Sequence, residues 1–229
     1  MAYDTLPEDS LTQSVMRRLA LVWIDFEGRL EQVPIIRRLN AGRFTLEDYR
    51  ALLLDLRQQV VDGGCWITRA ASHVDAEHID LRSRFMRHAV TEHRDFQMLE
   101  ANYVNVGGEA DDIRRGRKNI GSEALSAYMF HKASQPNPFD LLGAMFIIEG
   151  LGSRKATEWG TAIRDTLHLR DDQVSFLLYH GEEDDDHLAD FEKWVTRIVR
   201  KPEEGDALVR TAEVVARLYA LQLEEVGRG

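Results

Sequence analysis

The stretch LLYHGEEDDDHLADF carries ionisable side chains at positions that a helix would bury. Residues three and four apart share one face of a helix, so His180, Asp184 and His187 fall on a single stripe. The same stripe continues through Phe191, whose ring is expected to be buried. Burying ionised groups without a partner costs several kcal/mol for each group. The stripe is therefore either partly solvated or bound to something that neutralises it.

A second stretch, FMRHAVTEHRDFQMLEANY, shows the same conflict. A continuous helix places His88, Glu92 and Asp95 within one sector of its surface. The same sector carries the apolar and aromatic residues Phe85, Leu99 and Tyr103. His93 points about 100° away from Glu92 and is predicted to lie at the surface.

The third stretch, LLGAMFIIEGLGSRKATEW, places Glu149 among aliphatic side chains on a helical stripe. Gly150 and Gly152 follow it, and each glycine inside a helix costs about 1 kcal/mol relative to alanine. A close approach by a ligand or another helix would explain them.

Imidazoles and several carboxylates that converge from three helices are the ligand set of di-iron and di-manganese sites in helical bundles. Hard oxygen ligands with a minority of nitrogen suit Fe(II) or Mn(II). The single cysteine, Cys65, excludes a thiolate zinc module, and its neighbours in GGCWITRAA predict a buried thiol. The sequence therefore favours a metal site.

Each group also has a simpler interpretation. His180 can be a satisfied core or helix-end histidine, and the acidic run EEDDD can be a solvated first helical turn. Glu149 can pair with Arg154 or Lys155. His88 can bond to Glu92 one turn further on. The sequence would encode no metal site only if all of these alternatives were true at once.

Apolar residues recur at steps of three and four, and only five prolines occur, which predicts an all-α protein. Thr45 and Asp48 form a capping-box pattern, Ser122 is an expected N-cap, and Asn137 followed by Pro138 is an expected N-cap and N1 pair. The expected helices cover residues 11–39 with a break near Pro34, 45–67, 79–106, a short segment from 122, 137–167, 182–200 and 202–225. Ligand sites in such bundles are built from the inward side chains of facing helices.

Composition limits the function. The chain has 229 residues and a formal charge of −10, which argues against nucleic acid and against an anionic membrane surface as partners. No signal sequence and no apolar run of about 18 residues occurs. We expect a cytoplasmic protein with one domain over residues 1–229, of which 1–10 form a flexible tail.

The spacing of His180, Asp184 and His187, with Glu149 in FIIEGLGS about thirty residues earlier, resembles the ligand pattern of the heme-oxygenase-like metal-oxidase family. This family is related in fold to TenA thiaminases, the PqqC oxidase and the chlamydial CADD protein. The stretch HAVTEHRDFQMLEANYVNVGG is similar to the family's His-x-x-x-Glu-x-x-His helix. The resemblance covers about residues 40–200. Asp95 stands where the family pattern has a histidine, and this replacement changes the charge and redox potential of the site.

The resemblance implies a seven-helix heme-oxygenase-like bundle with Fe(II), two ions per chain, or Mn(II). In that arrangement His180, Asp184 and His187 anchor one metal, and Glu149 or Glu92 bridges the two ions. Glu92 and Asp95, with His88 as an additional nitrogen donor, hold the second metal. The expected activity is that of a non-heme oxidase or oxygenase that uses O2, with an external reductant, on a small molecule such as an amino acid, a fatty acid or an aromatic amine.

Two rival functions stay open. The first is a metal-free enzyme similar to PqqC or TenA, in which the same residues perform acid–base chemistry. The second is a heme binder or a catalytically silent binding protein. The first predicted helix contains LALVWIDFEGRL, which has no histidine, and this counts against heme. Dimerisation is common among such bundles, so a homodimer is compatible with the sequence.

Overall fold

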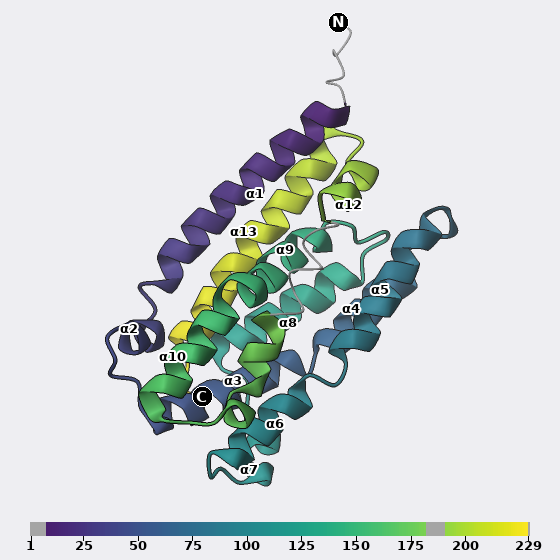
Figure 1. Cartoon of the computed structure of the whole chain (residues 1–229). Coiled ribbons are helices and arrows are strands. Elements are labelled where there is room, and N and C mark those ends of the chain that lie inside the picture. Colours follow the sequence, from purple (N-terminus) through teal and green to yellow (C-terminus); the bar gives the residue numbers. More distant parts are fainter. Residues whose placement is uncertain (1–7, 182–190, 229) are drawn as a thin grey trace, which may run out of the picture.

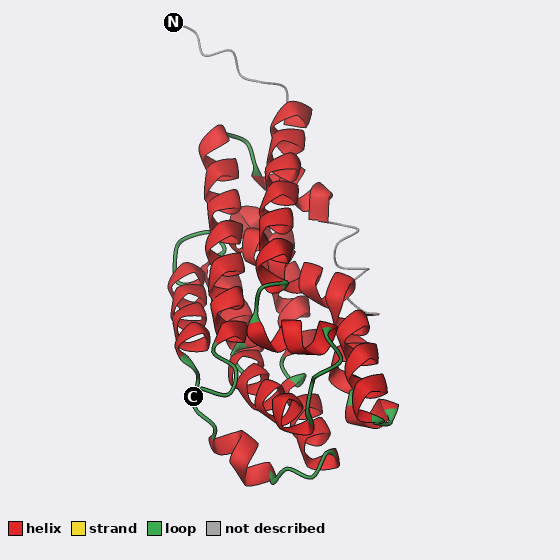
Figure 2. Cartoon of the chain, turned by 90° about the vertical axis from the view of Figure 1, so that its left-hand side faces the viewer, coloured by secondary structure: helices red, strands yellow, loops and turns green. Residues whose placement is uncertain are grey.

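The computed structural model of the chain describes residues 8–181 and 191–228. Within these residues all regular secondary structure is helical, as Figure 2 shows. Asp184 and His187 lie outside the described residues. The prediction of an all-α protein is therefore confirmed, and the number of separate helices exceeds seven because several predicted helices are broken by turns.

Two long helices, α1 (Glu8–Leu30) and α13 (Pro202–Glu224), lie side by side along the molecule (Figure 1). Helices α8 (Ile120–Ala133) and α9 (Leu141–Leu151) pack against α13 at two glycines. A Cβ atom on Gly143 would lie 2.1 Å from the Leu208 carbonyl oxygen, and one on Gly121 would lie 2.2 Å from the Gln222 nitrogen. These glycines allow backbone-to-backbone contact, which brings α9 close to the centre of the bundle.

The N-terminal part of the bundle largely follows the predicted pattern. Helix α1 ends at Leu30, and α2 (Pro34–Asn40) begins with Pro34 in its first turn, so the predicted break is confirmed. The predicted helix 202–225 is confirmed by α13. Helix α1 begins at Glu8, so residues 8–10 of the predicted tail belong to a helix.

The predicted helix over residues 45–67 is wrong because the chain forms two helices there, α3 (Leu46–Val60) and α4 (Gly63–His73). The capping box is confirmed: Thr45 Oγ1 accepts from the Asp48 N–H at 3.1 Å, and Asp48 Oδ2 accepts from the Thr45 N–H at 3.0 Å. Gly63 and Gly64 follow the turn, and two successive glycines weaken a continuous helix.

The predicted helix over residues 79–106 is also broken. After a 3-10 turn, η1 (Ala76–His78), helix α5 (Ile79–Glu92) ends, and α6 (Phe96–Asn105) begins after a short turn at 93–95. His93 Nδ1 bonds the Val90 carbonyl at 2.7 Å, and such a bond competes with the backbone ladder of a helix. His93 is exposed, as predicted. Gly107, with φ of +80°, closes α6 near the predicted end.

Two predicted N-caps are wrong. After α7 (Ala110–Arg115), helix α8 is capped by Asn119, whose Oδ1 accepts from the Ser122 N–H at 2.9 Å. Asn137 caps no helix, because its side chain binds both the backbone N–H and the carboxylate of Asp75, at 2.8 and 2.6 Å. These long-range bonds hold Asn137 at a φ of +46°.

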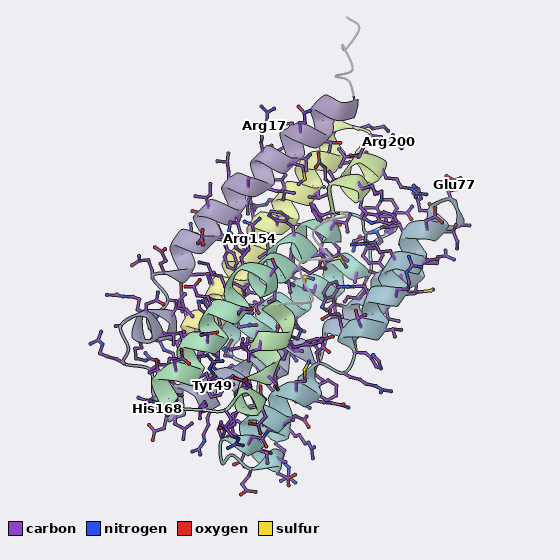
Figure 3. The ribbon with its side chains drawn as sticks, viewed as in Figure 1. Arg17, Tyr49, Glu77, Arg154, His168 and Arg200 are labelled. Atoms are coloured by element: carbon purple, nitrogen blue, oxygen red, sulfur yellow. The ribbon has the colours of Figure 1, made fainter. Side chains whose placement is uncertain are left out.

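The chain continues from α9 through a π-helical turn, η2 (Gly152–Ala156), into α10 (Thr157–Leu167), so the predicted end near residue 167 is confirmed. A 3-10 turn, η3 (Asp171–Gln173), precedes a helical segment described over residues 175–181, and α12 (Phe191–Ile198) follows the undescribed residues. Tyr49, labelled in Figure 3, ties α3 to η3, because its hydroxyl donates to the Gln173 carbonyl at 2.7 Å. Burial raises the pKa of Tyr49, so the hydroxyl keeps its proton.

The thiol of Cys65 is exposed, contrary to the prediction, because it lies on the outer side of α4 while Trp66 and Ile67 face the core. No helix within residues 8–181 and 191–228 is both long enough and apolar enough to span a bilayer.

Candidate metal centre

Glu92, Asp95 and His180 form the centre of the candidate site. Each residue offers one ligand atom, and these atoms all lie within 4.8 Å of one another. Glu92 is the last residue of α5, Asp95 lies in the turn before α6, and His180 comes from the 175–181 segment. Asp95 is 7% exposed, so its carboxylate is largely removed from water.

The imidazole of His180 lies between two acceptors. Its Nδ1 atom is 2.8 Å from the Phe176 carbonyl oxygen, and its Nε2 atom is 3.2 Å from Asp95 Oδ2. Because a carbonyl only accepts, Nδ1 carries a proton. In the neutral imidazole the Nε2 lone pair then faces a carboxylate, and these two groups attract each other only with a proton or a cation between them. Metal-binding histidines show this pattern, in which one ring nitrogen is held by a carbonyl and the other binds the ion.

Asn102 on α6 positions the segment that carries His180. Its amide nitrogen donates to the Asp172 carbonyl at 3.0 Å and to Ser175 Oγ at 2.8 Å. Its amide oxygen accepts from the Phe176 N–H at 3.1 Å, which satisfies a backbone donor in the first turn of the segment. Asn102 is fully buried. It therefore fixes His180 relative to α6, which follows directly after Asp95.

A second imidazole–carboxylate pair is formed by His88 of α5 and Glu149 of α9. His88 Nε2 lies 3.3 Å from Glu149 Oε1, and both side chains are largely buried. The alternative partners considered for Glu149 are engaged elsewhere. Lys155 binds Glu27 at 2.7 Å, and the Arg154 guanidinium, labelled in Figure 3, lies 4.7 Å from the centroid of the Trp23 ring on α1.

The backbone next to Glu149 is unusual. The π-helical turn η2 begins three residues after it, and π-helical turns inside helices occur frequently at functional sites. Gly150 meets the Trp23 ring, because a Cβ atom there would lie 3.0 Å from Trp23 Cζ3. The predicted close approach of another helix at Gly150 is thus observed.

A cavity of about 110 Å³ adjoins both pairs: it is lined by His180 of the first pair and by His88 and Glu149 of the second. Since one water needs about 10–15 Å³, the cavity can hold a small molecule. Its described lining includes His88, Glu92, Glu149 and His180. The other walls are mostly apolar and include Leu52, Leu56, Trp66, Met145, Trp159 and Leu223.

The structure thus brings together five of the predicted ligand residues: Glu92, Asp95 and His180 in the cluster, and His88 and Glu149 in the second pair. Asp184 and His187 lie outside the described residues, so their assignment stays a prediction. Sequence reasoning missed Asn102 and Gln59, a cavity-lining residue of α3. The signal for Gln59 was a polar side chain three residues after Leu56 and seven after Leu52, on an apolar stripe.

The donor set fits a hard divalent metal. Two carboxylates and an imidazole are the ligand types that Fe(II) and Mn(II) accept, and Nδ1 of His180 is already engaged by a carbonyl.

Comparison with solved structures shows that the fold is heme-oxygenase-like. A protein from Shewanella denitrificans, described as a domain of unknown function with a heme oxygenase-like fold, is 19% identical with a TM-score of 0.83, and the match covers 91% of this chain and 90% of that chain. A TenA homolog from Pseudomonas syringae pv. tomato is 14% identical with a TM-score of 0.74, covering 100% and 98%. A TenA homologue from P. horikoshii is 15% identical with a TM-score of 0.73, covering 95% and 98%. The predicted fold class is confirmed.

The family follows from a match over most of the chain. The model of a family described as iron-containing redox enzymes matches residues 72–220, which is more than half of the chain. The protein therefore belongs to this family. The matched residues include His88, Glu92, Asp95, Glu149 and His180. A search of the curated proteins found no match.

Proposed function

We propose that the protein is a non-heme iron oxidase or oxygenase that acts with O2 on a small molecule. The observation that carries this proposal is the position of His180, whose Nδ1 is held by the Phe176 carbonyl while Nε2 faces Asp95 at 3.2 Å. Glu92 lies close enough to complete a three-residue ligand set. Membership in a family of iron-containing redox enzymes supports iron as the metal.

In this proposal Glu92, Asp95 and His180 hold one ion, and His88 and Glu149 contribute to a second ion on the same cavity. Asp184 and His187 are proposed as further ligands from the sequence. Mn(II) is an alternative to Fe(II), because both ions take this donor set. When bound, reduced iron with O2 supplies the oxidising power, and an external reductant restores it.

The protein's own residues orient the candidate ligands and exclude bulk water from the cavity. Apolar side chains such as Leu56, Trp66 and Met145 keep bulk water from the reacting end of the cavity. The Phe176 carbonyl fixes the orientation of the His180 ring, and the Phe176 ring packs against it with the two centroids 4.2 Å apart. Asn102 holds this helical segment in place.

Elemental analysis tests the proposal. Untagged protein is stripped with a chelator, reloaded anaerobically with Fe(II) and analysed by mass spectrometry, next to the variants His180→Ala and His131→Ala. His131 is exposed on α8 and serves as the matched control. We expect about two irons per chain in the wild type and in the control, and a clear loss in His180→Ala. Equal iron in all three proteins, or none in any of them, would contradict the proposal.

A second candidate is a metal-free enzyme that uses the same residues as acids and bases. Two direct imidazole–carboxylate contacts, His180 with Asp95 and His88 with Glu149, favour it because such pairs hold and move protons. The structural similarity to TenA homologues is compatible with it. This candidate predicts that the chelator-treated protein keeps its full turnover of a substrate, whereas the iron enzyme loses it.

A further inference from the structure

The cavity beside the candidate metal centre is lined, within the described residues, by carboxylates but by no ammonium or guanidinium group. Its described lining contains Glu92 and Glu149 but neither Lys nor Arg. The residues that the structure does not describe, 1–7, 182–190 and 229, contain no Lys or Arg either. In the part of the chain that the structure describes, no lysine or arginine lines the cavity, and the two lining histidines, His88 and His180, each lie against a carboxylate. An anionic group placed away from a bound metal would lose its hydration without gaining a counter-charge, which costs several kcal/mol.

Gln59 is the polar residue that α3 contributes to the cavity. It lies on the same stripe as Leu52 and Leu56, which also line the cavity, and it is 8% exposed. Its side-chain amide forms no hydrogen bond with any described residue. The amide of its neighbour Gln58, in contrast, donates to the Ile113 carbonyl at 2.6 Å. Gln58 is therefore bonded within the protein, whereas the donor and the acceptor of the Gln59 amide are available to a ligand in the cavity.

Helix α3 contributes no member of the histidine and carboxylate cluster, so Gln59 belongs to a different wall from the candidate metal ligands. The amide of Gln59 lies at the cavity wall, so a ligand there can form a hydrogen bond with it. An amide offers one acceptor and two donors but no charge. It can bond to a hydroxyl, a carbonyl or an amide of a ligand, and it supplies no charge to balance a carboxylate or a phosphate.

We propose that Gln59 is a specificity-determining residue that binds an uncharged polar group of a small, mostly apolar substrate. That the other end of this substrate lies at the metal rests on the proposed function. The preference of Gln59 for an uncharged polar group does not. Among the classes expected from the sequence, this disfavours fatty acids and amino acids whose carboxylate would lie away from the metal. It favours molecules such as aromatic alcohols, amides and neutral aromatic amines.

Binding of three probes that share a phenyl ring tests this inference. Ethylbenzene has no polar group, 2-phenylethanol carries a hydroxyl, and phenylacetate carries a carboxylate. Dissociation constants are measured by ligand-observed NMR titration for the wild type and for Gln59→Leu. The matched control is Gln13→Leu, the same substitution at an exposed glutamine of α1. Each protein is measured as purified and after chelator treatment.

We expect chelator-treated wild-type protein to bind 2-phenylethanol at least about tenfold more tightly than phenylacetate. Gln59→Leu should weaken 2-phenylethanol binding by about threefold to tenfold, the value of one hydrogen bond between uncharged groups, in both metal states. The same variant should leave ethylbenzene binding unchanged or improved. Gln13→Leu should behave as the wild type.

The inference would be overturned by equal loss of ethylbenzene and 2-phenylethanol binding in Gln59→Leu, or by no loss of either. Binding of phenylacetate by chelator-treated protein as tight as that of 2-phenylethanol would also overturn it. Absence of binding by both uncharged probes would overturn it as well. The probes are compared on chelator-treated protein, so this test stays valid even if the protein binds no metal. The iron analysis described above tests the metal proposal alone.

Discussion

Asp95 and His180 lie 85 residues apart in the chain, and the structure brings Asp95 Oδ2 to within 3.2 Å of His180 Nε2. The contact joins the turn between α5 and α6 to the 175–181 segment. Because Nδ1 of the same ring is bound to the Phe176 carbonyl, the contact depends on a proton or a cation between the two side chains. This dependence makes Asp95 the most informative position for substitution.

Asp95→Asn keeps the size of the side chain and removes its charge. The Asn amide can donate to the Nε2 lone pair, so we expect the thermal stability of chelator-treated protein to stay the same or to rise. Fe(II) affinity should fall by at least about tenfold, since a carboxylate ligand is lost. Fe(II) titration and thermal unfolding, with exposed Asp112→Asn of α7 as the control, measure both effects. Unchanged affinity would show that Asp95 is not a ligand.

Glu149→Gln tests the second pair separately. The amide can still bond to His88, so the fold should be kept, while the charge that a second ion needs is removed. We expect iron to fall from about two to about one per chain. The control is Glu158→Gln, an exposed position on α10. Iron content equal to that of the wild type would remove Glu149 from the ligand set.

Gly64→Ala should disturb the centre from a distance. A Cβ atom on Gly64 would lie 2.8 Å from His93 Cβ and 2.9 Å from His93 Cα, so the turn that carries Asp95 must shift. We expect a loss of about 1–3 kcal/mol in the free energy of unfolding and Fe(II) affinity that is weaker by about tenfold or more. The adjacent Gly63→Ala meets open space and should keep both quantities near those of the wild type. Equal behaviour of the two variants in the Fe(II) titration would argue against this role of the turn.

Gly143→Ala and Gly28→Ala should change stability in opposite directions. The first adds a Cβ atom 2.1 Å from the Leu208 carbonyl oxygen and forces α9 away from α13, with a loss of about 3 kcal/mol. The second adds a methyl group in open space within α1 and should stabilise by about 0.5–1 kcal/mol. Urea unfolding measures both. A stable Gly143→Ala variant would mean that α9 and α13 do not pack this closely.

The capping box of α3 gives a pH-dependent contribution to stability. Burial raises the pKa of Asp48, but hydrogen bonds from Arg38 and Thr45 outweigh it, and the pKa lies below the usual 3.8. A carboxyl whose pKa is lowered on folding stabilises above its unfolded pKa and loses this effect as the pH falls. Asp48→Asn should therefore cost about 1 kcal/mol at pH 7 and less as the pH falls below about 4. In Thr45→Ala the loss of the hydroxyl cap should persist at low pH, because threonine does not titrate in this range.

The sequence predicted the features that depend on local patterns. Apolar periodicity indicated helices, and Thr45 with Asp48 correctly predicted a capping box because both partners lie within one turn. Asn137 failed as a predicted cap because its side chain is held by Asp75, 62 residues away, and no local pattern reveals that bond. The number of domains and the ligand roles stay predictions.

In the candidate site, too, the sequence predicted what local patterns show and missed what long-range contacts decide. Glu92, Asp95 and His180 were predicted on the assumption of continuous helices, and the residues do converge although α5 and α6 are separate. The turn that separates them lies against Gly64 of α4, and this contact between helices cannot be read from a local pattern. Gln59 was not predicted, although its place on the apolar stripe of Leu52 and Leu56 is visible in the sequence; only the fold shows that this stripe lines the cavity.

The turn between α5 and α6 also bears on how such a centre can change over evolutionary time. Had Glu92 and Asp95 stood within one helix, the rigid rise of about 1.5 Å per residue would have fixed their spacing. Instead the exposed residues His93 and Arg94 lie between them, and exposed turn positions accept substitution without repacking the core. Mutations there would move the two carboxylates closer together or further apart, so in the proposed metal centre they would change the ionic radius that the pair accepts while the bundle stays the same.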